Sequence, residues 1–272
     1  MATSTHASPH PNFGTELVRE WVPEGEPRAI VVLVHGLAEH CGRYERTGSL
    51  LADAGLHVRS FDLVGAGGSG GRRWHVDDWA QYHDQVAPHI EWARAQGKPV
   101  VLMGHSLGGN IALGYVLSER PVPDLLVLSA PGIAGGAGWQ RALAPVLAKL
   151  APTLAIPNNL DGALLSRDPA VAEAYFADPL VVTKSTTKLG ALLFDQFDRL
   201  NDQLGGLDVP TFVIHGGDDR IVPTRSSEPL GDLDCVDRKV YPGLRHEILN
   251  EPEGPEIVAD IVSWIDRHLP RT

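Results

Sequence analysis

The sequence contains few cysteines, little positive charge and no long apolar run, and each of these shortages excludes a class of protein. Its 272 residues include two cysteines, Cys41 and Cys235, which are too few for a disulfide framework. A single bridge between them stays open, but a reduced, cytoplasmic protein is the better prediction. The most apolar stretch, 142–156, is broken by two prolines and a lysine and is too short to span a bilayer.

The balance of charge excludes further partners. Lys and Arg number 23 against 34 Asp and Glu, which gives a formal net charge of −11. An acidic chain repels phosphate backbones, and no Lys/Arg cluster offers a local exception, so no nucleic acid partner is expected. The same charge disfavours docking on anionic membranes, so any lipid contact would have to be apolar. The 29 glycines and 21 prolines make up about 18% of the chain, below the roughly 25–30% of low-complexity sequences.

Short apolar runs alternate with helical patterns along much of the chain. This order is typical of an α/β fold with a mostly parallel central sheet flanked by helices. The predicted strands are 29–34, 56–61, 100–103, 125–129, 211–215 and 238–241, and 15–22 is expected to be an antiparallel edge strand. Helices are predicted at 49–54, 79–96, 107–119 and 255–268, where apolar residues recur at mixed spacings of three and four.

Residues 132–200 interrupt this rhythm, since they hold many prolines, several short helix-like pieces and no convincing strand. In a doubly wound sheet such an insertion usually covers the strand ends. We therefore expect an α/β core formed by 1–131 and 201–272 and an inserted helical cap, or lid, at 132–200. Residues 1–13 lack the pattern of a signal peptide and are expected to be a disordered leader. Segment 142–156 is either a cap helix packed on the core, which we favour, or a transient membrane contact.

The strongest local motif is Gly-His-Ser-Leu-Gly at 104–108, with a further glycine at 109. The pattern G-x-S-x-G places a serine on a sharp strand-to-helix turn, where glycines are needed because the backbone is strained and packs closely. The pattern occurs twice, because Ser69 lies within Gly-Gly-Ser-Gly-Gly at 67–71. Only Ser106 follows a buried strand and precedes an amphipathic helix, so Ser106 is predicted to be a nucleophile and Ser69 a loop residue.

A serine hydroxyl needs an adjacent base that is held by a third group. In folds with this serine turn, the acid and then the histidine follow the nucleophile along the chain. The acid is expected just after a late strand, where either Asp218 or Asp219 could serve. The base is expected in the loop after the last strand, where His246 lies.

Acyl transfer also requires donors for the oxyanion of its tetrahedral intermediate. One predicted donor is the backbone N–H of Leu107, which follows the serine, and the other is that of Leu37, in the loop after the first long strand. The alternative for this loop is a simple turn between strand and helix. The remaining histidines are most simply interpreted as structural, and no HExxH or other ligand spacing occurs, so no metal and no cofactor are expected.

Several sequence blocks resemble the α/β-hydrolase superfamily and, within it, the bacterial members of the monoacylglycerol lipase group. The similarity extends from about residue 29 to residue 269. The blocks are HGLAEHCGRY at 35–44, GHSLGG at 104–109, HGGDDRIVP at 215–223, YPGLRHEILNE at 241–251 and, in the expected cap, SRDP at 166–169, Tyr175 and DPL at 178–180. The spacing of the third block in the family selects Asp219 over Asp218 as the acid.

The resemblance implies an α/β-hydrolase fold and a cofactor-free serine esterase. The implied reaction is hydrolysis of a monoacylglycerol to glycerol and fatty acid through an acyl-enzyme, with an apolar cap over an acyl tunnel. Glu39 and Arg43 match family positions near the glycerol end. They are candidate substrate-binding residues, although a structural ion pair is the favoured interpretation. The sequence departs from the family at Val64 and Ala66, where an arginine and a histidine are usual, and at Arg245, where an aromatic residue is common.

Alternative functions stay open at this stage. Within the same chemistry, the protein could be a broader carboxylesterase or a lysophospholipase. From a different class, the fold can serve as a non-catalytic small-molecule binder, but that case usually shows a damaged triad. Here Ser106, Asp219 and His246 are all present, which favours an enzyme. Its expected partner is a lipid ester substrate, and its expected location is cytoplasmic, with peripheral membrane contact left open.

Overall fold

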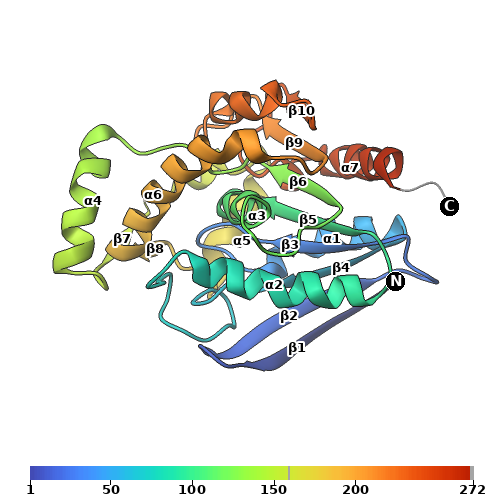
Figure 1. Ribbon diagram of the computed structural model, residues 1–272, viewed down its shortest axis with the longest axis horizontal. Coiled ribbons are helices and arrows are strands. Elements are labelled where there is room, and N and C mark those ends of the chain that lie inside the picture. Colours follow the sequence, from blue (N-terminus) through green and yellow to red (C-terminus); the bar gives the residue numbers. More distant parts are fainter. Residues whose placement is uncertain (159, 270–272) are drawn as a thin grey trace.

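A twisted, mostly parallel sheet of eight strands forms the centre of the protein (Figure 1). The computed structural model describes residues 1–158 and 160–269. The strands lie in the order β1-β2-β4-β3-β5-β6-β9-β10. Strand β2 is antiparallel to both of its neighbours, β1 and β4, and all other neighbouring pairs are parallel. Their bounds are β1 (Ala2–His10), β2 (Gly14–Val22), β3 (Ala29–Val34), β4 (Leu56–Phe61), β5 (Val100–His105), β6 (Leu125–Ser129), β9 (Thr211–Gly216) and β10 (Val236–Tyr241).

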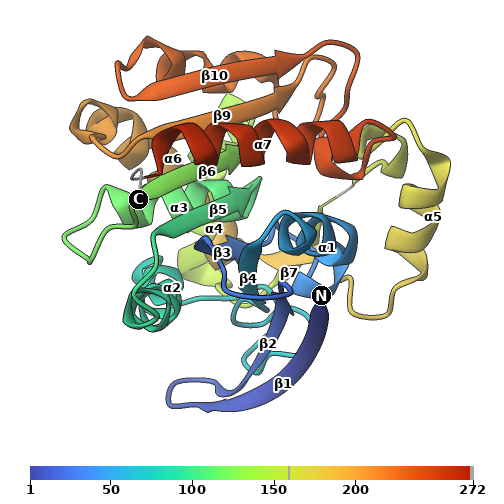
Figure 2. The same ribbon diagram turned by 90° about the vertical axis from the view of Figure 1, so that its right-hand side faces the viewer.

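Helices cover both faces of this sheet. Helices α1 (Glu45–Asp53) and α7 (Gly254–His268) lie on one face, in front of the sheet in Figure 2, and α2 (Ala80–Ala95) and α3 (Leu107–Val116) lie on the other. Burial on both sides explains why the parallel strands read as continuous apolar runs. Successive side chains of a strand point to opposite faces. Val32 accordingly packs in the cluster with α2 and α3, whereas Val31 packs in the cluster with α1 and α7.

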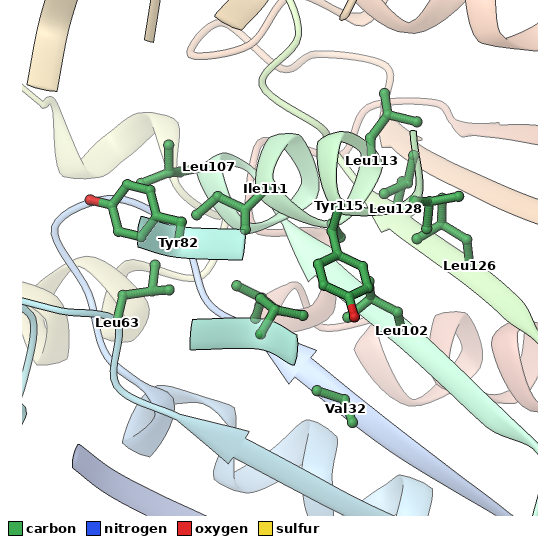
Figure 3. Packing of buried hydrophobic residues seen from close by; sticks show 14 of the residues in the cluster. Val32, Leu63, Tyr82, Leu102, Leu107, Ile111, Leu113, Tyr115, Leu126 and Leu128 are labelled. Carbon is green, nitrogen blue, oxygen red and sulfur yellow. The ribbon is translucent and has the colours of Figure 1, made fainter. Parts of the chain in front are cut away.

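The packing of α3 fixes the end of β5, where the candidate site begins. All residues of α3 are buried. In Figure 3 the side chains of Val32 and Leu102 point from the sheet toward Tyr115 of this helix, and Leu126 and Leu128 lie beside Leu113. Because α3 is buried along its whole length, its first turn has little freedom to shift relative to the strand that precedes it.

The N-terminal segment is a strand, which corrects the expectation of a disordered leader at 1–13. Strand β1 pairs with β2 along its full length, from Ala2 opposite Val22 to His10 opposite Gly14. It is polar and mostly exposed, so neither of its faces has the apolar alternation that would reveal a strand in the sequence. The antiparallel strand predicted at 15–22 is present as β2, but its predicted place at the edge of the sheet is wrong, because β1 occupies that edge.

Residues 132–200 lie between β6 and β9 and contain most of the remaining elements. Figure 1 shows α4, α6 and the β7–β8 pair gathered at one side of the molecule. The bounds of the elements in this segment are α4 (Gly138–Leu150), β7 (Ala155–Pro157), η2 (Gly162–Leu164), α5 (Pro169–Ala177), β8 (Lys184–Thr186) and α6 (Thr187–Gln203). Further short 3₁₀ helices lie elsewhere in the chain, at η1 (Cys41–Tyr44), η3 (Leu204–Gly206), η4 (Thr224–Asp232) and η5 (Ile248–Asn250). The sequence predicts no strand in residues 132–200, because three-residue strands such as β7 and β8 are too short to show a period.

Helix α4 is not buried against the core, whereas the sequence favours a helix packed on the core for segment 142–156. It contacts α6, yet none of its residues is buried. Trp139 and Leu150 are 69% and 76% exposed, and Leu143 and Val146 on the same helix are also exposed. Within the described ranges, no helix is both long and apolar enough to cross a membrane. The expected helix is present only up to Leu150, since β7 begins at Ala155, and four of the large apolar side chains of α4 are exposed.

Candidate active site

Ser106 lies on the sharp turn between β5 and α3. Its φ is +53° and its ψ is −114°, a strained conformation for a residue with a Cβ. A Cβ at Gly104 would overlap the carbonyl oxygen of Gly108, and a Cβ at Gly108 would overlap that of Val34. Both flanking glycines are therefore required by close backbone approach, as the motif predicts. The turn holds the Ser106 side chain beyond the carboxyl end of the sheet.

Loops that follow three different strands bring Ser106, His246 and Asp219 together. The Ser106 hydroxyl donates to Nε2 of His246 at 2.9 Å, and Nδ1–H of His246 donates to Oδ2 of Asp219 at 2.7 Å. Ser106 follows β5, Asp219 follows β9 and His246 follows β10, and the carboxyl ends of parallel strands share one edge of a sheet. The geometry is that of a nucleophile, a general base and an orienting carboxylate.

Asp219 is held as a carboxylate by its hydrogen bonds. Its Oδ1 accepts the backbone N–H groups of Ile221 and Val222, both at 2.9 Å. Its Oδ2 also accepts Nε2–H of His215 at 3.1 Å. Burial alone would raise the pKa of Asp219, but hydrogen bonds from His215 and His246 hold that pKa well below its usual range. A carboxylate that stays charged can fix the imidazole of His246 and stabilise its protonated form.

The structure distinguishes the two adjacent aspartates. Asp219 is buried against His246, whereas Asp218 is exposed and contacts the loop after β10 through its backbone N–H, which donates to the Leu244 carbonyl at 2.9 Å. The residues alone left both candidates open. The second donor to Asp219, His215, was not predicted, although its place four residues before the acid is a signal that could have suggested it.

His105, the neighbour of the serine, stays neutral at neutral pH. Burial, followed by the proximity of His246, lowers the pKa of His105 to about 4. The two imidazole rings lie 4.8 Å apart, and Nδ1 of His105 is 3.1 Å from the Ser129 hydroxyl. A neutral His105 adds no positive charge beside His246, so it does not oppose the protonation that general-base catalysis requires.

Two backbone N–H groups are free to face an oxyanion. Leu107 is the first residue of α3 and Leu37 lies in the loop after β3, and both line the same cavity as Ser106. Among the described residues, neither N–H donates to a backbone or side-chain acceptor. The neighbouring Gly36 N–H is occupied, because it donates to Oε1 of Glu39 at 2.6 Å. The start of α3 also contributes the positive end of a helix dipole.

Glu39 and Arg43 belong to a buried ion-pair network that also contains Glu247. Nη1 of Arg43 lies 2.7 Å from Glu39 and 2.6 Å from Glu247, and Nη2 donates a further bond of 2.8 Å to Glu247. Burial alone would raise the pKa of Glu39, but the charge of Arg43 lowers it to about 2. Arg43 also lies over the ring of Tyr175 at 4.6 Å. Both residues thus have structural partners, while Glu39 and Glu247 line the cavity.

The cavity beside Ser106 has a volume of about 340 Å³. Residues 132–200 contribute much of its wall, and the described lining from that segment is mainly apolar or aromatic: Ala134, Leu160, Leu165, Tyr175, Leu193, Phe194 and Phe197. A larger open groove of about 770 Å³ lies between α1 and α7 but shares no lining residue with it. The sequence did not predict these apolar wall residues, because they come from several short elements.

Hydrogen bonds and an ion pair tie residues 132–200 to the loops around Ser106. The Tyr175 hydroxyl donates to the Ala38 carbonyl at 3.3 Å. Nε2 of His40 lies 2.8 Å from Asp178. The buried carboxylate of Glu251 accepts the Ser166 hydroxyl and the Arg167 backbone N–H, at 3.1 and 3.0 Å, and the Arg245 backbone N–H. The α5 side of the segment is therefore fastened to the core.

The departures from the family pattern have structural explanations. Val64 and Ala66 are buried in the apolar core together with Trp74. Where the family pattern would place an arginine and a histidine, this chain has apolar packing. Arg245 donates from Nη1 to the Ser166 carbonyl at 2.8 Å and so joins the loop of His246 to the inserted segment. In the part of the chain that is described, no group of three or more His, Cys, Asp or Glu could hold a metal ion.

Comparisons with known proteins agree with this geometry. The family model described as serine aminopeptidase, S33 (Hydrolase_4) matches residues 25–253. A monoacylglycerol lipase of Mycolicibacterium smegmatis is 37% identical over 258 residues, covering 92% of this chain and 92% of that protein. The phospholipase YtpA of Bacillus subtilis is 30% identical, covering 89% of this chain and 97% of its own length.

A solved structure supports the same assignment. The crystal structure of a Paleococcus ferrophilus monoacylglycerol lipase has a TM-score of 0.84 and 33% identity, with 92% of this chain and 98% of that chain covered. The predicted α/β-hydrolase fold is confirmed, and so is the predicted class of enzyme. The chain belongs to the Hydrolase_4 (serine aminopeptidase, S33) family of α/β-hydrolases and is a carboxylic ester hydrolase of the monoacylglycerol lipase and esterase group.

Proposed function

We propose that the protein hydrolyses monoacylglycerols to glycerol and free fatty acids. The observation that carries this proposal is the composition of the Ser106 cavity, which combines an apolar wall with the carboxylates of Glu39 and Glu247. Apolar side chains suit an acyl chain, and carboxylates accept hydrogen bonds from hydroxyl groups such as those of glycerol. We also infer that residues 132–200 act as a cap, because they supply much of the apolar wall.

In the proposed mechanism, His246 takes the proton of Ser106 as its oxygen attacks the ester carbonyl. Asp219 holds the tautomer of His246 and stabilises the imidazolium. The N–H groups of Leu37 and Leu107 stabilise the oxyanion, each by roughly 3–4 kcal/mol. The tetrahedral intermediate expels glycerol, to which His246 returns the proton. Water, activated by the same histidine, then hydrolyses the acyl-enzyme and releases the fatty acid and free Ser106.

The proposal is tested by measuring glycerol release from monoacylglycerols of increasing acyl length. A nitrophenyl ester, a diacylglycerol and a lysophospholipid serve as competing substrates, with Ser106→Ala as the blank. We expect the highest kcat/KM for a monoacylglycerol. A preference for short nitrophenyl esters would overturn the lipase assignment and leave a general esterase.

The lysophospholipid arm tests a specific alternative, because the chain is 30% identical to a phospholipase. We expect this substrate to be poor. The chain carries a net charge of −11, and the polar part of the cavity presents two carboxylates, so a phosphate headgroup meets repulsion rather than a cation. Arg43 cannot easily compensate, because its guanidinium is already shared between Glu39 and Glu247. Faster hydrolysis of the lysophospholipid would contradict this assignment.

We further propose that α4 contacts the aggregated lipid from which the substrate is taken. Trp139, Leu143, Val146 and Leu150 are spaced by four, three and four residues and form one exposed apolar face. A membrane contact of this kind depends on apolar burial, as expected for an acidic protein. The proposal makes α4 a peripheral attachment rather than a spanning segment.

Replacement of Val146 and Leu150 by serine is expected to weaken binding to uncharged phosphatidylcholine vesicles by at least about tenfold, since burial of a valine or leucine side chain contributes roughly 1.5–3 kcal/mol. Neither residue lines the described cavities. Co-sedimentation measures the partitioning. Val122→Ser is the matched control, because Val122 is 40% exposed and lies outside α4. The proposal fails if wild-type partitioning and activity do not respond to vesicles, or if the control weakens binding equally.

A further inference from the structure

A second cavity lies beside the one that contains Ser106. It has a volume of about 330 Å³, is partly open to solvent and is lined by residues of α4, α6 and the β7–β8 pair, which lie together in Figure 1. Leu143, Leu147 and Ile156 supply apolar walls. Among the described residues, the two cavities share Asn158 and Phe194 as lining, so the Phe194 side chain stands at their boundary.

The ring of Phe194 is held at this boundary from three sides. A Cβ at Gly136 would overlap the ring, so the ring packs directly on the backbone there. The guanidinium of Arg141 lies 5.4 Å from the ring centroid and pairs with Asp198, one turn further along α6. The ring of Phe197 lies 6.1 Å away. Moving Phe194 aside therefore breaks a cation–π contact and an aromatic contact.

We propose that Phe194 determines the acyl-chain length that the enzyme accepts, by closing the Ser106 cavity toward the second cavity. The inference rests on the proposed function, because it concerns the acyl chain of the ester that Ser106 cleaves. At about 340 Å³, the Ser106 cavity is near the lower end of the roughly 300–1,000 Å³ usual for small-molecule sites. On this proposal the Ser106 cavity holds a medium chain, and a long chain that extends toward the second cavity meets Phe194.

Gly190 offers a way to fill the second cavity alone. It lies on α6 four residues before Phe194, lines the second cavity and is not part of the described lining of the Ser106 cavity. A Cβ at this position meets no atom within 4 Å. Substitution is also compatible with the helix, where glycine has a poor intrinsic propensity. Gly190→Phe therefore places a ring in the second cavity without altering the site of reaction.

The experiment compares kcat/KM for esters with eight and sixteen acyl carbons. We expect wild type to have the higher kcat/KM for the eight-carbon ester. Phe194→Ala should raise the ratio of kcat/KM for sixteen carbons to kcat/KM for eight by at least roughly tenfold, which is the lower end of the discrimination that one methylene in an apolar pocket provides. Gly190→Phe alone should leave the eight-carbon rate unchanged, and adding it to Phe194→Ala should abolish the gain. Loss of fold stability cannot produce this pattern, because it affects both chain lengths equally.

Each outcome decides the proposal. A wild-type preference for sixteen carbons, an unchanged ratio in Phe194→Ala, or a gain that Gly190→Phe does not reverse would overturn it. Phe194→Leu, which keeps an apolar side chain, provides the same test with an intermediate shift if the alanine variant does not fold. Measuring both a monoacylglycerol series and a nitrophenyl ester series distinguishes failure of the proposed substrate from failure of the proposed role of Phe194. If only nitrophenyl esters are cleaved, the proposed substrate is wrong, and the ratio in that series still tests Phe194.

Discussion

Replacement of Ser106 by alanine is expected to lower kcat on every ester by a factor on the order of 10⁶, as in serine proteases that lose the nucleophile. The hydroxyl that attacks the carbonyl is removed, and no acyl-enzyme can form. The strained turn and the N–H groups of Leu37 and Leu107 remain. Residual activity then reflects only substrate binding and oxyanion stabilisation. Initial rates with a nitrophenyl ester measure the effect, and a fluorophosphonate should no longer label the protein.

Ser69 provides the matched control because it lies in the second G-x-S-x-G pattern. Its hydroxyl donates to the Asp62 carbonyl at 2.7 Å and accepts the Leu17 N–H at 3.0 Å. Ser69 is buried, so Ser69→Ala should lower the free energy of unfolding by about 1–3 kcal/mol through lost hydrogen bonds. Its kcat should be unchanged. Activity that survives in Ser106→Ala, or disappears only in Ser69→Ala, would show that the wrong serine has been assigned.

The second large effect is expected for Asp219→Asn, with kcat reduced by about 10⁴. The backbone N–H groups of Ile221 and Val222 donate to the Oδ1 position, which therefore selects the amide oxygen. The amide nitrogen must then occupy the Oδ2 position and face Nδ1 of His246. A donor at this place forces His246 to carry its hydrogen on Nε2. That nitrogen can then no longer accept the proton of Ser106.

Asp218→Asn is the control for this variant, because it makes the same chemical change one residue away on an exposed side chain. We expect its kcat to stay within about twofold of wild type, as for surface substitutions away from a site. Thermal unfolding of both variants checks that each is folded at the assay temperature. Equal loss of activity in the two variants, or a greater loss in Asp218→Asn, would contradict the role of Asp219.

Much of the fold could be predicted from the sequence because parallel strands are buried on both faces. The run AIVVLV over Ala29–Val34 has no polar residue to mark a solvent face, and the predicted strand and β3 coincide. The glycines at 104 and 108 similarly revealed the Ser106 turn, since close backbone contact permits no other residue there. By contrast, β1 was missed because both its faces are exposed, so its pairing with β2 leaves no apolar period.

The choice between Asp218 and Asp219 shows the limit of reasoning from residue types alone. The two aspartates are adjacent in the loop after β9, and it took the spacing of the family block or the contact of Asp219 with His246 to distinguish them. The outward face of α4 and the position of Phe194 were likewise decided by tertiary structure. Periodicity shows that a helix has an apolar side, but whether that side is covered depends on neighbours distant in the chain. The sequence by itself determined the buried strands of the sheet, the serine turn and the class of enzyme, because close packing on both faces of the sheet and around the turn permits few other residues. Packing between the core and residues 132–200 decided the shape of the Ser106 cavity and left the apolar face of α4 exposed, because both depend on side chains that are distant in the sequence.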